Sequence, residues 1–112
     1  MMLPILLLVL LNGPAGGEKI YCGKAEGAKN PAVINARSVF LQIEEYKKIV
    51  DKGLTDKDPE YFVLLAEANR KFYAAVIKAA ADHKYDCVAE EGTVTFKAVD
   101  ATSQVIGALK AP

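Results

Sequence analysis

Tryptophan is absent from this 112-residue chain, histidine occurs once, and the formal charges sum to zero. A nucleic-acid-binding protein needs a surplus of lysine and arginine facing the phosphates, so the zero net charge argues against that function. The single histidine, His83, leaves the two cysteines without the partners that a metal site requires. The glycines form no phosphate-binding loop between a strand and a helix. We therefore expect no cofactor, metal or nucleic acid.

A hydrophobic run long enough to span a membrane is also lacking. The apolar run at residues 3–11 has nine residues, whereas a membrane-spanning helix needs about 20. Nine residues are typical of a signal peptide, and Ala15, Gly16 and Gly17 would suit cleavage before Glu18. No basic residue precedes the run, so an uncleaved anchor and a core strand stay open as alternatives. We predict a signal peptide over residues 1–17 and a periplasmic or secreted protein that meets the membrane only during export.

Cleavage would leave one small domain, residues 18–112. A domain of this size buries only about 60–65 % of the surface of its unfolded chain, so a second chain or a disulfide would stabilise it. Two cysteines in an exported chain favour a bridge between Cys22 and Cys87. Closing that loop of about 65 residues would contribute about 4 kcal/mol in the chain-entropy model. Two separate thiols are the alternative.

Periodicity predicts the first half of this domain. Residues 19–22 and 32–36 are expected to be strands, the second β-branched and preceded by proline. Apolar residues at spacings of three and four then predict a helix over residues 37–52, which Gly53 would end. A second helix is predicted over residues 59–83, antiparallel to the first because the loop between them is short.

The second helix has strong start signals and an apolar seam. Asp58 can cap it, and Pro59 fits its first turn. The seam follows the alternating spacing of a coiled coil and comprises Phe62, Leu65, Asn69, Phe72, Val76, Ala79 and His83. Asn69 could fix register or oligomeric state from within the seam, or could lie at its edge if the helix is rotated. Both interpretations stay open.

Residues 86–90 and 93–97 are predicted to form a β-hairpin around the turn Glu91-Gly92. Asp100 can cap a last short helix. The order of elements predicts an α+β fold: a small antiparallel β body with an inserted helical hairpin arm and a C-terminal helix.

The acidic pairs Glu44-Glu45 and Glu90-Glu91 are the nearest approach to a catalytic arrangement. Acid–base catalysis needs two carboxylates that converge on a substrate. Neighbours on a helix diverge by about 100°, and neighbours on a strand face opposite sides. No nucleophile is spaced to work with His83. We expect a non-enzymatic protein.

Three stretches resemble one protein family. "PAVINARSVFLQIEEYKKIVDKGL" resembles the strand and helix that begin members of the Skp/OmpH family of periplasmic chaperones. "HKYDCVAEEGTVTF" resembles the family's returning hairpin, and "DATSQVIGALK" resembles its closing helix. None of these stretches is specific alone, but their order and spacing cover nearly the whole of residues 18–112.

The resemblance implies a homotrimer that holds unfolded outer-membrane or envelope polypeptides without ATP. Its β body would comprise residues 31–40 and 85–110, and its helical arm residues 41–84. Client contact would fall on the inner surface of the arm, unless the residues concerned form the core between the two helices. These residues are Tyr46, Ile49, Tyr61, Phe62 and Leu65.

Two features depart from the family. The arm is short, and its tip balances four positive against four negative charges, so it projects little field beyond a Debye length of about 8 Å. The tip residues are Lys47, Lys48, Asp51, Lys52, Asp56, Lys57, Asp58 and Glu60. The fold is therefore carried over better than the client-holding activity. The alternative function is a small secreted structural or interaction domain that docks one specific partner through its helical hairpin.

Overall fold

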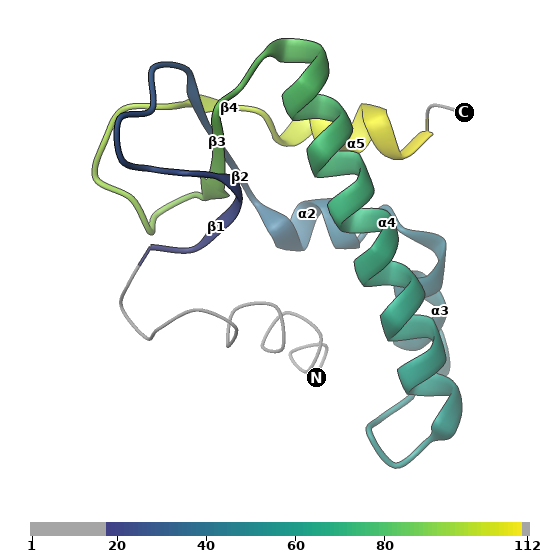
Figure 1. Ribbon diagram of the computed structural model, residues 1–112. Coiled ribbons are helices and arrows are strands. Elements are labelled where there is room, and N and C mark those ends of the chain that lie inside the picture. The colour runs from purple at the N-terminus through teal and green to yellow at the C-terminus, as the bar shows by residue number, and fades with distance from the viewer. Residues whose placement is uncertain (1–17, 111–112) are drawn as a thin grey trace.

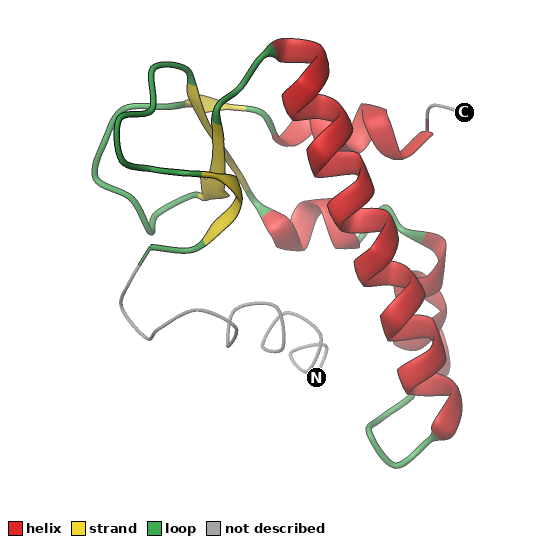
Figure 2. Cartoon of the chain, viewed as in Figure 1, coloured by secondary structure: helices red, strands yellow, loops and turns green. Residues whose placement is uncertain are grey.

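Helices lie beside a small four-stranded sheet in the computed structural model, which describes residues 18–110 (Figure 1). The predicted signal peptide lies outside the described residues. The elements are β1 (Ile20–Gly23), β2 (Pro31–Ile34), α2 (Ala36–Phe40), α3 (Glu44–Lys52), α4 (Pro59–His83), β3 (Cys87–Glu90), β4 (Val99–Asp100) and α5 (Thr102–Lys110). Figure 2 shows the strands gathered on one side of the molecule and the helices on the other. The α+β class is confirmed.

The sheet is mixed, with strand order β1-β3-β2-β4. Strand β2 runs parallel to β3, with Val33 opposite Ala89, and β4 runs parallel to β2. Only β1 is antiparallel to its neighbour, β3. The prediction that the segments around residues 33 and 88 meet in one sheet is confirmed, but the prediction of an antiparallel body is wrong. Parallel neighbours need a long crossover, and α2, α3 and α4 provide it.

The predicted hairpin of residues 86–90 and 93–97 does not form. Both edges of β3 are already occupied, by β1 on one side and by β2 on the other. The chain does turn after Glu90, where Thr93 donates its hydroxyl to the Glu90 carbonyl at 2.7 Å. The same hydroxyl accepts the Lys19 amide at 3.1 Å, so it ties the turn to the start of β1. The last strand then pairs with β2 through Val99.

The single helix predicted over residues 37–52 is two helices, α2 and α3. A tight turn separates them, in which the Gln42 amide donates to Val39 at 2.9 Å and the Ile43 amide donates to Phe40 at 3.0 Å. The Ile43 side chain is 2 % exposed. Because the turn returns Ile43 to the core, the apolar spacing continues across the break and conceals it from the sequence.

Helix α4 has the predicted bounds, and its central part packs on both the sheet and α2. The Phe72 ring stacks on Phe40 with centroids 4.7 Å apart and meets the Tyr21 ring of β1 edge-on at 5.2 Å. The buried residues of α4 are Tyr61, Leu65, Ala68, Phe72, Ala75, Val76, Ala79 and Ala80. Four predicted seam residues are among them, but Phe62 and His83 are exposed. Thus α4 is partly arm and partly cover for the sheet.

Asn69 is half-buried at the edge of this core. Its side-chain oxygen is buried and has no hydrogen-bond partner among the described residues. The position agrees with the rotated-helix interpretation, in which Asn69 lies beside the seam.

The two ends of α4 are held differently from what capping rules predict. Asp58 is the N-cap residue, but its carboxylate accepts the Thr55 amide at 2.9 Å instead of a helix amide. At the other end, the Asn30 side-chain amide donates to the carbonyls of His83 and Lys84 at 3.3 and 2.8 Å. The loop between β1 and β2 therefore satisfies acceptors that the end of a helix leaves open. Asp100, predicted to cap α5, lies one residue before the N-cap position, and its carboxylate accepts the amide of the first helical residue, Thr102, at 3.0 Å.

A close backbone approach at Gly23 locks β1 to the segment after α4. Gly23 has φ +77°, and a Cβ atom there would lie 2.1 Å from the Asp86 carbonyl oxygen. The Asp86 carboxylate accepts the amides of Lys29 and Asn30 at 2.6 and 3.0 Å. These hydrogen bonds hold the pKa of Asp86 below its usual value. Only glycine fits at position 23 without displacing this junction.

We predict that Gly23→Ala lowers the free energy of unfolding by more than about 2 kcal/mol, because backbone strain and a clash with Asp86 add together. Gly53→Ala is the matched control. Gly53 also has positive φ, but nothing lies within 4 Å of its added Cβ, so only the strain of about 1 kcal/mol remains. Urea titration followed by circular dichroism measures both. Equal losses in the two variants would contradict the close approach at Gly23.

Candidate functional site

The five residues predicted to contact a client do not share one surface. Tyr46 and Ile49 of α3, and Tyr61 and Leu65 of α4, are each at most 5 % exposed. Their side chains belong to the buried core, where α3 and α4 lie against each other. Phe62 is 54 % exposed. Four of the five residues therefore build the arm, and one lies on its surface.

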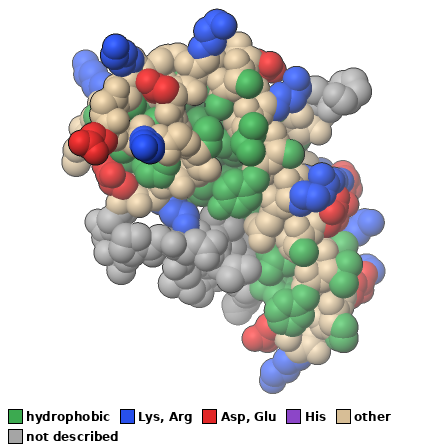
Figure 3. Space-filling view, in the orientation of Figure 1, with side chains coloured by type: hydrophobic (Ala, Val, Ile, Leu, Met, Phe, Trp, Pro, Cys, Tyr) green, Lys and Arg blue, Asp and Glu red, His purple; other side chains and the backbone are tan. Residues whose placement is uncertain are grey.

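A second row of apolar residues runs along α4 on the side away from that core. Its exposed members are Phe62, Val63, Ala66, Ala74, Ile77 and Ala81, here called the outer stripe. Val63 and Ile77 are 69 % and 59 % exposed. Spacings of three and four place these residues on one side of the helix. Figure 3 shows hydrophobic side chains on the face where α4 runs, including a group toward the end of the arm.

Charged residues line one edge of the outer stripe. They are Glu60, Glu67, Lys71 and Lys78, here called the charged flank. Each is in an ion pair within the chain: Lys52–Glu60, Arg70–Glu67, Lys71–Glu45 and Lys78–Asp82. Exposed pairs of this kind contribute about 0.2–1 kcal/mol each to stability. The flank is therefore acidic in the first half of α4 and basic in the second half, with no excess of either charge.

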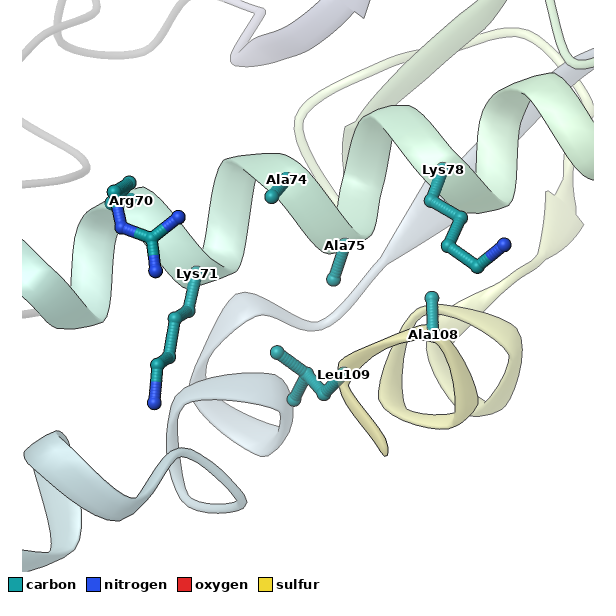
Figure 4. Close-up of a pocket in the computed structure, with 7 residues that line it drawn as sticks. All are labelled: Arg70, Lys71, Ala74, Ala75, Lys78, Ala108 and Leu109. Atoms are coloured by element: carbon teal, nitrogen blue, oxygen red, sulfur yellow. The ribbon is translucent and has the colours of Figure 1, made fainter. Parts of the chain in front are cut away.

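A shallow hollow of about 270 Å³ lies between α4 and the end of α5 (Figure 4). Its floor is apolar, from Ala74, Ala75, Ala108 and Leu109, and its rim carries Arg70, Lys71 and Lys78. Each rim cation already has a carboxylate partner. The hollow consequently offers an apolar contact surface more than an anion-binding site.

Glu90 is a polar link that the sequence analysis missed. One oxygen of its carboxylate accepts the Tyr21 hydroxyl at 2.8 Å and the Ala36 amide at 3.0 Å, so it joins β3 to β1 and to the start of α2. Burial raises the pKa of Glu90 above its usual value, although both hydrogen bonds oppose that rise. Burial and the nearby carboxylate likewise raise the pKa of Tyr21. Both donors to the Glu90 carboxylate belong to the protein itself, so these hydrogen bonds hold β1, β3 and α2 together.

The predicted disulfide is not formed in the structure, and both cysteines are free thiols. Cys22 lies opposite Val88 in the ladder, whereas Cys87 lies opposite Gly23. Consecutive residues of a strand face opposite sides, so Cys87 and Val88 point to different faces of the sheet. Cys22 is half-buried against the main apolar core, and Cys87 is fully buried. Burial raises the pKa of both thiols.

His83 ends α4 and is exposed, with its ring stacked on Tyr85 at a centroid distance of 5.6 Å. Within residues 18–110, no group of three or more His, Cys, Asp or Glu residues is arranged to hold a metal ion. In the same part of the chain, no helix has both the length and the hydropathy that crossing a bilayer requires.

Comparison with known proteins does not assign the chain to a family: no family model, no curated protein and no solved structure matches it.

We predict that Glu90→Gln leaves the protein at least as stable as the wild type at pH 7. The raised pKa of Glu90 favours its neutral form in the folded state, so the wild type loses stability as pH rises through that pKa. Glutamine is neutral throughout, so the variant lacks this loss, and at pH 4 the two proteins converge. Glu90→Ala should cost about 1–3 kcal/mol at either pH, because it leaves two buried donors unpaired. Urea titrations at both pH values measure these differences. If the wild type became more stable relative to Glu90→Gln as the pH rises from 4 to 7, the raised pKa would be contradicted.

We predict that a thiol reagent modifies Cys22 in the native protein and Cys87 only after unfolding, since Cys87 is 0 % exposed. The reaction with an aromatic disulfide, followed by absorbance, should show one fast and one slow thiol. Cys22→Ser should remove the fast phase alone. If no thiol reacts even in denaturant, the two cysteines are bridged and the strand register at Cys22 is different.

Proposed function

We propose that this chain is a non-enzymatic protein that binds unfolded envelope polypeptides without ATP, as a holdase of the Skp/OmpH type would. The observation that carries the proposal is the outer stripe of α4. Three of the large apolar side chains that the fold leaves most exposed, Phe62, Val63 and Ile77, lie on this one side of a single helix.

The geometry of the outer stripe suits an unfolded ligand better than a folded one. From Phe62 to Ile77 the helix rises by about 22 Å, the length of about seven residues of extended chain. A convex helix face with alanines between larger residues has no deep pocket, so it discriminates little between apolar sequences. Covering apolar surface contributes about 25 cal/mol per Å². Binding therefore depends on the total area covered and can be spread over many weak contacts.

The resemblance described above supports the same role. The order of strand, helical arm, returning strand and closing helix is the order that the resemblance implies, and α3 with the first part of α4 extends away from the sheet (Figure 1). Export to the periplasm, self-association and the identity of the clients belong to the proposal; the resemblance alone implies that the assembly is a trimer.

An aggregation assay tests this function. An outer-membrane β-barrel protein is diluted from denaturant, and light scattering is followed with increasing amounts of this chain. We expect suppression near stoichiometric amounts. The triple variant Phe62→Ser, Val63→Ser and Ile77→Ser should need about tenfold more protein for the same effect, since about 1.4 kcal/mol of binding is a tenfold change.

The matched control is Leu41→Ser with Val50→Ser, which removes exposed apolar side chains that are not part of α4. It should protect as the wild type does. Loss of protection in the control but not in the triple variant would contradict the proposal. Saturable binding to one folded partner, with no protection of unfolded protein, would favour the interaction-domain alternative.

A further inference from the structure

The residues along the outer side of α4 are arranged almost symmetrically about positions 69 and 70. Glu60 lies nine residues before position 69 and Lys78 nine residues after it. Glu67 and Lys71 lie two residues before and after the same position. Among the apolar residues, Phe62 and Ile77 are equally far from the midpoint between 69 and 70. Each acidic residue of the flank thus has a basic residue at the same distance on the other side of the centre. The large apolar residue Phe62 has Ile77 as its counterpart in the same way.

We propose that the outer stripe is a self-association surface, on which α4 of a second copy lies antiparallel. In an antiparallel pair centred near position 69, Glu60 of each copy faces Lys78 of the other. Glu67 likewise faces Lys71. Each pairing occurs twice, because the contact is isologous. The inference concerns the same surface as the proposed function, so a second copy and an unfolded polypeptide would compete for the outer stripe.

The charged flank selects the antiparallel arrangement. In a parallel, in-register pair the two-fold axis runs along the helices, so the charged flanks of the two copies lie on opposite sides of the interface and Glu60 does not meet Lys78. The parallel pair therefore gains no attraction between oppositely charged flank residues, which is the contribution that charge complementarity makes to an interface. In the antiparallel arrangement the charged flanks of the two copies meet each other, and so do the apolar sides.

Arg70 interrupts the outer stripe near its centre, four residues from both Ala66 and Ala74. It is in an ion pair with Glu67 of the same chain, joined by two hydrogen bonds. Each copy therefore brings a neutralised arginine to the centre. Ala66 and Ala74 flank it, and small residues allow two helices to approach at about 8–10 Å between axes.

A surface that meets itself about a two-fold axis closes as a dimer. This outcome differs from the trimer that the family resemblance implies, which would be built through the β body. In the dimer, the side chains that contact unfolded polypeptide are covered by the second copy.

Sedimentation equilibrium of the protein over a range of concentrations tests the dimer. We expect a monomer–dimer equilibrium that Lys78→Glu weakens by about tenfold, since it replaces two attractive contacts by two repulsive ones. The double variant Glu60→Lys with Lys78→Glu should restore most of the affinity, because the cross-chain pairs are then reversed but intact. It loses two exposed pairs within the chain, Lys52–Glu60 and Lys78–Asp82.

Lys47→Glu is the control. It makes the same charge change at an exposed ion pair on α3, away from the outer stripe, and should leave dimerisation unchanged. Circular dichroism of each variant establishes that it is folded. A monomer at all concentrations would overturn the proposal. So would a trimer, or a dimer that Lys78→Glu does not weaken or that the double variant does not restore. The aggregation assay uses a different ligand, so failure of the dimer and failure of client binding are observed separately.

Discussion

The pairing of β2 with β3 is the constraint on which the rest of the molecule depends. It joins residues 31–34 to residues 87–90 in parallel register, and the crossover between them contains α2, α3 and α4. Once β2 fills one side of β3, the opposite side accepts β1, and β4 is left to pair with the outer side of β2. The same pairing places the Glu90 carboxylate beside the start of α2, where it accepts the Ala36 amide. Helix α4 can then pack Phe72 against both α2 and β1.

Local signals in the sequence were sufficient for several elements. Proline and β-branched residues mark β2, and Asp58 with Pro59 marks the start of α4. The meeting of residues 33 and 88 in one sheet also followed from the order of elements. The antiparallel arrangement was wrong because a turn at Glu91-Gly92 is a hairpin only if an edge of β3 is free. The edge is filled by β1, and the Lys19 amide, next to that strand, donates to the Thr93 hydroxyl. These residues are far apart in sequence, so no local pattern contains that information.

The candidate site was predicted only in outline, because α4 is apolar on more than one side. Tyr61 and Phe62 are adjacent aromatic residues, and a rotation of about 100° per residue decides which is buried. The structure buries Tyr61 and exposes Phe62, because the core also takes Ala68 and Ala75, which a search for large apolar residues passes over. The outer stripe also contains several alanines, so a search for large apolar residues did not recognise it either. Glu90 was missed because its partners, Tyr21 and Ala36, are distant in sequence.

Native-state hydrogen exchange tests the central role of β2 and β3 most directly. Regions differ in the free energy of the opening that exposes their amides, and the most stable unit exchanges only by global unfolding. The account predicts that the hydrogen-bonded amides of residues 32–34 and 88–90 exchange slowest, with a free energy equal to that of global unfolding. Amides of α3 and of the loop before α4 should exchange through smaller openings. Slow exchange in α3 together with fast, sub-global exchange in β2 and β3 would contradict the account.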